Sequence, residues 1–462
     1  MLALEFVRGV FIGTCLLLLR CADAASPRPQ LVVWIDTNAP VVGMLSTHPE
    51  LSRDAAIDIV HIEVLNDNGD TYASRDLLAP APEDWPLSFG IVPARASATV
   101  HLRVRAYNAA LVRQNDPSSL RASANVIIDR LADFVQRGDG IDARVILLDG
   151  ACFGAQPTFA TTANPTPHTC VDGHVGAPTD GIGSLTGGAP QSQVGTWARA
   201  KEAPCVRSPP AGSVCIPGGV TFLGDFSLRG FTNGITQRNS SPPRPVALSP
   251  FFLDRTEFTV GRYRKLVVSK ILKAPTPGAI AFRPCTWLRA DDPANDQLPL
   301  QCVDHETAVA ACTALGGTLP SEAQWEHAAR GRGQHFRYAW GNDEPVCCSA
   351  SYAEDRCGPA TVTPVGSHTK CVGGPVDVSA DGVLDLAGSV NEYTSDIYAD
   401  YDSAIWNGKI VVDPNHPTGD SGWTSRGAAW ADPVGALLAA LRFTVPPTET
   451  LGFRCAYSDG PP

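Results

Sequence analysis

"DHETAVAACTALGGTLPSEAQWEHAARG", residues 304–331, predicts two consecutive helices joined by a short turn. Asp304 can cap the first helix, which runs through "ETAVAACTAL" and ends at Gly316-Gly317. Ser321 and Gln324 form a capping box for the second helix, "EAQWEHAAR", which ends at Gly331. Because long loops surround this pair, we expect a domain of mixed α and β structure, over residues 215–458, in which the helices are scaffold.

The N-terminal part of the chain has the alternation of β-strands instead. Strand patterns occur in "LVVWID" near residue 31, "DIVHIEVL" (58–65), "TVHLRVRAY" (99–107) and "ARVILL" (143–148), with turn signals between them. Several short strands in this arrangement predict a β-sandwich, which we place at residues 30–170. No constellation of titratable groups stands out in this stretch, so we expect a structural or binding role for it.

Between the two regions the periodicity is lost. The stretch "VDGHVGAPTDGIGSLTGGAPQSQVG", which follows Cys170, is roughly one third Gly and Pro, a level typical of linkers. We therefore expect a linker at residues 171–214. The whole chain is predicted to be an α+β protein in which a β-sandwich precedes a C-terminal mixed domain.

The overall charge excludes one class of partner. The 462 residues have a formal net charge of −11 and contain no dense Lys/Arg cluster. A nucleic-acid-binding protein needs a basic surface, so we expect neither DNA nor RNA as a partner.

The first 24 residues have the pattern of an export signal. Arg8 precedes an apolar run at residues 10–19, and Ala22-Asp23-Ala24 provides an A-x-A site with cleavage expected after Ala24. A lipid anchor on Cys21 is disfavoured because Arg20 stands where a small residue is needed. No other segment is long enough to cross a bilayer, so we expect an exported protein in the periplasm, at the cell surface or secreted.

Cysteine usage agrees with export. Twelve of the 14 cysteines lie outside this signal, and disulfides are the default in an oxidising compartment. Short spacings favour Cys152 with Cys170 and Cys205 with Cys215. The pairing among Cys347, Cys348, Cys357 and Cys371 stays open, and no C-x2-C spacing supports a zinc site there.

Eight motifs in the C-terminal region resemble those of a known family. In order they are "IPGGVTFLGD" (216–225), "PFFLDRTEFTVGRYRKLV" (250–267), "LPLQCVDHETAVAACTALGGTLPSEAQWEHAARG" (298–331), "YAWGND" (338–343), "PVGSH" (364–368), "DLAGSVNEYTSD" (385–396), "RGAAW" (426–430) and "LGFRCAY" (451–457). Their order and spacing resemble the formylglycine-generating enzymes, also called sulfatase-modifying factors, over residues 216–458. This resemblance implies a variant of the C-type-lectin fold and a disulfide between Cys312 and Cys455. We expect a second one between Cys285 and Cys302.

The family's oxidase chemistry depends on copper and on two cysteines that follow its "RGGSW" motif. Two soft thiolates hold Cu(I). In this sequence the matching positions are Asp432 and Leu437, and no cysteine lies between Cys371 and Cys455. We therefore expect neither copper nor formylglycine-generating activity, and we assign no catalytic residue.

Iron and calcium are the two other metals for which the sequence contains candidate ligands. Iron-dependent sulfoxide synthesis on the same fold uses histidine ligands, but His305, His327 and His335 are better explained as isolated side chains. In relatives the loop "GNVWEW" supplies oxygen ligands for calcium, and here the loop is "GSVNEY". Ser389 and Glu392 are therefore the candidate calcium ligands, against the alternative that Glu392 only bonds to the loop. We expect no other metal.

The remaining candidate pocket consists of Arg426, Trp430 and Asp432. The leading hypothesis is an exported protein that binds a protein, peptide or glycan ligand through a sulfatase-modifying-factor-like domain without copper chemistry. One alternative is a formylglycine-generating oxidase or another oxidoreductase that acts on protein thiols through non-standard residues. A second alternative is a structural envelope protein that docks through its β-domain.

Overall fold

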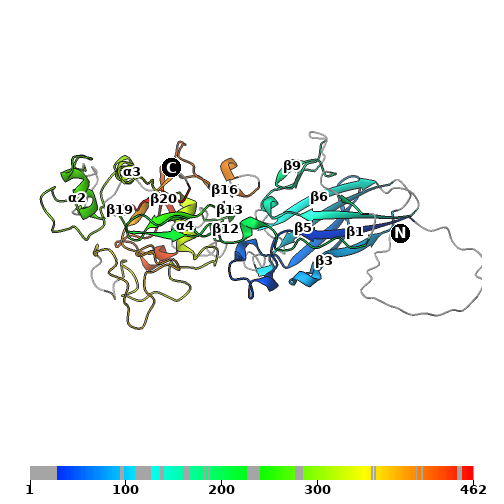
Figure 1. Ribbon diagram of the computed structural model, residues 1–462, viewed down its shortest axis with the longest axis horizontal. Helices are drawn as coiled ribbons and strands as arrows, with labels where there is room; N and C mark the ends of the chain where they lie inside the picture. Colours follow the sequence, from blue (N-terminus) through cyan, green and yellow to red (C-terminus); the bar gives the residue numbers. More distant parts are fainter. Residues whose placement is uncertain are drawn as a thin grey trace, which may run out of the picture. The chain divides into compact units, whose positions relative to one another are not determined.

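The structure is a computed structural model that describes most of the chain. The described residues are 29–93, 98–110, 126–135, 140–159, 166–179, 183–185, 188–225, 240–275, 285–354, 357, 361–401, 403–406, 409–444 and 450–460. The export signal and Cys21 lie outside them. The chain divides into two compact units, shown in Figure 1. Unit 1 comprises Met1–Leu51, Ala55–Ala200 and Gly408–Ile410, and unit 2 comprises Ser52–Asp54, Lys201–Asn407 and Val411–Pro462.

Unit 1 contains two four-stranded sheets. The first has the order β10-β7-β1-β4, with β1 at Gln30–Thr37, β4 at Leu87–Ile91, β7 at Ile141–Leu148 and β10 at Gly183–Ser184. The second has the order β3-β2-β5-β6, with β2 at Ile59–Leu65, β3 at Thr71–Leu78, β5 at Thr99–Tyr107 and β6 at Ile128–Val135. The four strands expected from the sequence are thus confirmed, while their assembly into a sandwich stays a prediction.

The strand β5 shows why the alternation is informative. Val100, Leu102, Val104 and Ala106 are buried, whereas His101, Arg103 and Arg105 are partly exposed. Because successive side chains of a strand point to opposite faces, one face of β5 can join the core while the other carries charge.

The range 171–214, where the sequence predicts a linker, contains short strands. Thr169–Val171 (β8) pairs with His174–Gly176 (β9), and β10 adds to the edge of the first sheet beside β7. The disulfide between Cys152 and Cys170 ties the start of this range to unit 1, and unit 2 begins at Lys201. Gly and Pro content predicts loops, but it does not prevent two or three residues from pairing at a sheet edge.

In its described residues, unit 2 combines three small sheets with three α-helices. One sheet joins β11 (Ser213–Ile216), β14 (Phe251–Asp254) and β20 (Ala456–Ser458), and another joins β12 (Gly219–Leu223), β13 (Arg244–Leu248) and β16 (Val411–Val412). The third has the order β18-β17-β15-β19, formed by Arg442–Thr444, Trp423–Arg426, Asn391–Ile397 and Leu451–Gly452. The helices are α2 (Val260–Val268), α3 (His305–Ala314) and α4 (Glu322–Ala329).

The two helices predicted from residues 304–331 are confirmed. The Asp304 carboxylate accepts the Thr307 amide at 2.8 Å at the start of α3. At the start of α4, Ser321 accepts the Gln324 amide at 3.2 Å and Gln324 accepts the Ser321 amide at 2.9 Å, which is the predicted capping box. Gly316 and Gly331 follow the helices with φ of 79° and 62°, a conformation that glycine adopts without strain.

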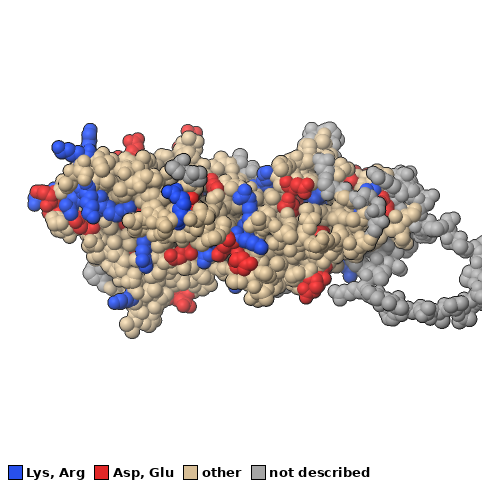
Figure 2. All heavy atoms as spheres, in the orientation of Figure 1, with Lys and Arg blue, Asp and Glu red and all other residues tan. Residues whose placement is uncertain are grey.

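Basic side chains gather over α2 in Figure 2. Two of them are already paired with carboxylates: Arg262 donates to Asp254 at 2.7 Å and Arg264 donates to Asp296 at 2.8 Å. These pairs neutralise much of the positive charge of α2.

Six disulfides join all twelve cysteines of the described residues. The structure contains Cys152–Cys170, Cys205–Cys215, Cys285–Cys302 and Cys312–Cys455, the four pairs expected from spacing and from the family resemblance. The cluster that the sequence left open pairs as Cys347–Cys357 and Cys348–Cys371. Among the described residues, no helix has the length and apolar character needed to span a membrane.

Candidate functional site

Arg426, a candidate pocket residue, is fully buried at the end of β17. It forms an ion pair with Glu326 on α4, and its Nη1 donates to the carbonyls of Leu441 at 2.8 Å and Ala440 at 3.3 Å. The guanidinium also lies 5.4 Å from the ring of Trp325. Every one of these contacts links β17 to α4 or to the chain before β18, so Arg426 holds the domain together.

Arg442 on β18 makes a second ion pair with the same helix. Its Nε and Nη2 donate to the two oxygens of Glu322 at 2.7 and 2.6 Å. Both groups are buried, and Arg426 Nη1 lies 3.7 Å from Glu322. Burying a charge is costly unless it is paired and hydrogen-bonded, so these arginines and glutamates depend on one another.

Trp430 and Asp432 lie in the loop after β17. Asp432 Oδ2 accepts the Ala429 amide at 2.8 Å and the Asn391 side-chain amide at 3.1 Å. Trp430 is 5% exposed, and its Nε1 donates to Gln301 Oε1 at 3.4 Å. The Asn391 amide also donates to the Gly427 carbonyl at 2.8 Å. The structure therefore brings Trp430 and Asp432 into one hydrogen-bonded loop with two residues that sequence reasoning did not select, Asn391 and Gln301.

Leu437, the second residue expected from the sequence at an oxidase cysteine position, is 1% exposed. It ends the 3-10 helix Val434–Leu437 and belongs to the same hydrophobic core as Trp325 and Leu386. The side chain contributes to packing, as its apolar neighbours do. A metal ligand at this position would have to replace a core residue.

Copper fits the described residues poorly. Cu(I) prefers soft thiolate ligands, whereas Asp432 offers a hard carboxylate already bonded to two amides and Leu437 offers only methyl groups. All twelve cysteines in the described part of the chain are in disulfides, so this part holds no free thiol.

The carboxylate of Glu392, a candidate calcium ligand, accepts hydrogen bonds from protein donors. Its Oε1 accepts Arg454 Nη2 at 2.6 Å, and its Oε2 accepts Arg454 Nε at 2.7 Å and Trp325 Nε1 at 2.9 Å. Although burial alone would lower the pKa of Arg454, the Glu392 carboxylate raises it above its ordinary value. A permanent positive charge beside Glu392 opposes the binding of Ca²⁺. Calcium binding at Ser389 and Glu392 thus stays a prediction that these contacts disfavour.

Other carboxylates near the same loop were not selected from the sequence. Asp377 accepts the Gly388 amide at 3.1 Å and the Ala387 amide at 3.1 Å, and burial, with the nearby Asp385, raises its pKa to about 7. The pKa of the buried Glu257 is also raised well above its usual value, mainly by burial and then by Asp385. Only the tertiary fold removes these groups from water, so no local pattern could have identified them.

Each of the three histidines considered as iron ligands contacts a different group of the protein. His305 stacks on Trp423 with ring centroids 3.5 Å apart, and His335 pairs with Asp54. His327 Nε2 lies 3.0 Å from the Pro217 carbonyl, and burial lowers the pKa of His327 to about 4. Among the residues that the structure describes, no group of three or more His, Cys, Asp or Glu side chains is arranged to hold a metal ion.

Comparisons with known proteins agree with the motifs. A family model described as "Sulfatase-modifying factor enzyme 1-like domain" matches residues 199–458. The formylglycine-generating enzyme of Bos taurus is 27% identical over 292 residues, which cover 54% of this chain and 75% of that protein. Hercynine oxygenase of Mycolicibacterium smegmatis is 26% identical over 263 residues, or 50% of this chain and 56% of that protein. Among solved structures, PvdO from Pseudomonas aeruginosa matches with a TM-score of 0.40 and 22% identity, over 53% of this chain and 93% of that chain.

Proposed function

Because the chain belongs to the family of sulfatase-modifying factor enzyme 1-like domains, we propose that it is an exported binding protein whose family domain has no copper-dependent oxidase activity. Within the family domain Arg426, Glu392 and Arg454 are buried and paired, as expected of framework residues. The ligand would be a protein, a peptide or a glycan. The C-type-lectin type of loop surface expected for this family suits all three, although a fold alone does not establish a ligand.

One observation carries this proposal, namely what occupies the two positions of the oxidase cysteines. Asp432 is used as a hydrogen-bond acceptor for Ala429 and Asn391, and Leu437 packs in the core. A side chain buried at 1% exposure cannot take part in binding a substrate thiol without local unfolding. The residues at these two positions thus have structural roles in place of reactive ones.

Export is supported by the disulfides. Six of them in the described part of the chain require an oxidising compartment for formation in most organisms. The apolar run at residues 10–19 provides the expected signal. Mass spectrometry of the protein purified from a secreting host tests both, since we expect an N-terminus at Ala25 and no free thiol.

A peptide oxidation assay tests the loss of oxidase activity. The full chain is incubated with a cysteine-containing sulfatase peptide, Cu²⁺ and a reductant, and formylglycine is detected by its mass. We expect no product above the level of the peptide alone, whereas an active formylglycine-generating enzyme assayed in parallel must convert the peptide. Turnover by this protein would reject the proposal.

A different oxidoreductase is the second candidate, because the chain is similar to both a formylglycine-generating enzyme and a hercynine oxygenase. It would have to act through Arg426, Asp432 and Glu392, all of which have structural partners. Elemental analysis of the purified protein separates the two candidates. Stoichiometric copper or iron favours the oxidoreductase, and their absence favours the binding protein.

A structural envelope protein remains the third candidate. In that case residues 25–170 would carry the docking and the family domain would act as a spacer. Pull-downs with the full chain and with variants altered on one unit at a time distinguish this case, because only changes in unit 1 would abolish capture.

A further inference from the structure

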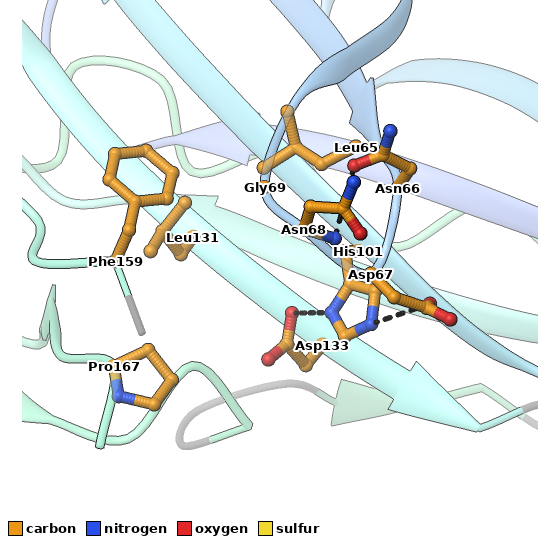
Figure 3. Close-up of a pocket in the computed structure, with 10 residues that line it drawn as sticks. All are labelled: Leu65, Asn66, Asp67, Asn68, Gly69, His101, Leu131, Asp133, Phe159 and Pro167. Carbon is orange, nitrogen blue, oxygen red and sulfur yellow. Dashed lines mark hydrogen bonds and ion pairs between the residues drawn. The ribbon is translucent and has the colours of Figure 1, made fainter. Parts of the chain in front are cut away.

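A pocket of about 130 Å³ lies on unit 1, and none of its lining residues belongs to the range 199–458 that matches the family model. Figure 3 shows it between the turn that joins β2 to β3, the strands β5 and β6, and the segment around Phe159 and Pro167. One side of the pocket is polar and the other is apolar. Nothing in the proposed function of the family domain uses this site.

The polar side is built on a rigid turn. The Asn66 side-chain oxygen accepts the amides of Asn68 at 3.1 Å and Asp70 at 2.9 Å, and the Asn66 carbonyl accepts the Gly69 amide at 2.9 Å. Gly69 has a φ of 84°, which suits a glycine. These bonds fix the backbone that presents the side chains of Asp67 and Asn68.

Two carboxylates flank one imidazole in this pocket. His101 Nδ1 lies 2.8 Å from Asp133 Oδ1, and His101 Nε2 lies 3.7 Å from Asp67 Oδ1. The second distance exceeds that of a hydrogen bond, so the Asp67 carboxylate, which is 95% exposed, contacts the histidine only as an ion pair when the imidazole is protonated. Even with a protonated imidazole, the three groups carry a net negative charge.

The neighbouring charges do not cancel this excess. Arg103, the next outward-facing residue of β5, is paired with Asp129 at 2.5 and 2.9 Å. Arg105 is paired with Glu63 at 2.8 Å. Since these arginines are matched within the sheet, the pocket keeps its attraction for an added cation.

The apolar side is formed by Leu65, Leu131, Phe159 and Pro167. Leu131 is 4% exposed and closes the floor. The Arg103 guanidinium lies 5.2 Å from the centroid of the Phe159 ring, so this ring already contacts one cation. A ligand that matches both sides needs a positive head and an apolar stem.

We propose that this pocket binds an alkylammonium group, with the ammonium beside the His101 imidazole and attracted by Asp67 and Asp133, and its methylene chain against Leu131 and Phe159. A lysine side chain of a partner protein and a free aliphatic diamine share this chemistry. An anionic ligand would be repelled by the two carboxylates. A purely apolar ligand would gain nothing from the two carboxylates.

Titration of the full chain by calorimetry tests the site. The probes are cadaverine and Nα-acetyl-lysine methylamide, and the controls are the Nε-acetylated form of the second probe and the corresponding norleucine derivative. We expect saturable binding of the two amines, weakening with added salt, and no saturable binding of the two controls. Tighter binding of the lysine derivative identifies a protein source, and tighter binding of cadaverine identifies a free amine.

A pair of variants on the same turn locates the site. Asp67→Asn removes the exposed pocket carboxylate, and Asp70→Asn removes an exposed carboxylate that does not line the pocket. We expect Asp67→Asn to weaken amine binding about two- to fivefold, as for an exposed ion pair, and Asp70→Asn to change it less than about 1.5-fold. Thermal melts confirm that both variants fold. Absence of amine binding, equal binding of the acetylated control, or equal effects of the two variants would overturn the proposal.

Discussion

The carboxylate of Glu392 and the guanidinium of Arg454 form a buried, two-point ion pair, with N···O distances of 2.6 and 2.7 Å. Glu392 belongs to β15 and Arg454 follows β19, which pairs in parallel with β15. Arg454 also donates to the carbonyls of Asp254 and Leu384, so this one side chain joins three segments of unit 2.

Removing one partner of this ion pair should destabilise unit 2 more than replacing both partners. We expect Arg454→Met to destabilise unit 2 by about 3–5 kcal/mol, because it leaves the Glu392 carboxylate buried without its cation. The double variant Glu392→Gln, Arg454→Met should lose less, since no unpaired charge remains. Urea unfolding followed by tryptophan fluorescence measures the stability of the double variant and of each single variant, Arg454→Met and Glu392→Gln. A loss in the double variant equal to the sum of the two single losses would contradict the expectation.

Calcium should have little effect on stability if Glu392 is saturated by Arg454 and Trp325. A ligand that binds only the folded state raises the melting temperature with its concentration. We therefore expect the melting temperature in EDTA to agree with that in millimolar Ca²⁺ to about 1 °C, with Mg²⁺ as the control cation. A rise of several degrees specific to Ca²⁺ would show that the family's calcium site persists.

The contribution of Asp377 to the stability of unit 2 should fall as the pH rises from about 4 towards 7. Burial raises the pKa of Asp377 to about 7, compared with 3.8 in an exposed chain, so the folded state holds a proton that the unfolded state has lost in this window. The stability that this proton provides is fully present at acidic pH and disappears above pH 7, with about 1.4 kcal/mol per pKa unit as an upper limit. Asp377→Asn should remove this contribution from the profile measured by urea unfolding and leave that of other buried carboxyls such as Asp396, while the exposed Asp420→Asn should leave the profile unchanged.

Leu437 and Asp432 should respond to truncation as structural residues. Leu437→Ala leaves a cavity in the core and should cost about 2–5 kcal/mol of unfolding free energy. Asp432→Ala removes the acceptor for two amides and should cost about 1–3 kcal/mol. A nearly neutral Leu437→Ala in equilibrium unfolding would mean that the core assignment is wrong and would reopen the question of a reactive site there.

The disulfides should differ in how much they contribute to the free energy of unfolding, because they close loops of different length. Cys312 and Cys455 are separated by 143 positions, and Cys347 and Cys357 by 10. In the chain-entropy model this difference corresponds to about 2 kcal/mol, so replacing the first pair by alanine should destabilise the protein more by about that amount. Guanidinium unfolding of the two double-alanine variants makes the comparison, and equal losses would indicate that strain or residual structure dominates.

Local patterns predicted the regular elements well. The caps at Asp304 and Ser321 and the alternation in residues 99–107 depend only on near neighbours in sequence, and the structure contains the corresponding helices and strand. Order and spacing of eight motifs were sufficient to recognise the family. The short strands β8 to β10 were missed because their pairing partners, not their composition, make them strands.

By itself, then, the sequence identified the two helices of residues 304–331, four strands of unit 1 and the family of the C-terminal region, and it predicts that Asp432 and Leu437 stand at the positions of the oxidase cysteines. The tertiary structure alone decided how these residues are used. In the folded protein Arg426 is buried against α4 and Glu392 forms an ion pair with Arg454. Burial raises the pKa of Asp377, and Asp67, His101 and Asp133 line one pocket. The reason is that burial and charge pairing depend on groups distant in sequence, such as Arg426 and Glu326, which are 100 positions apart, and no local pattern records their approach.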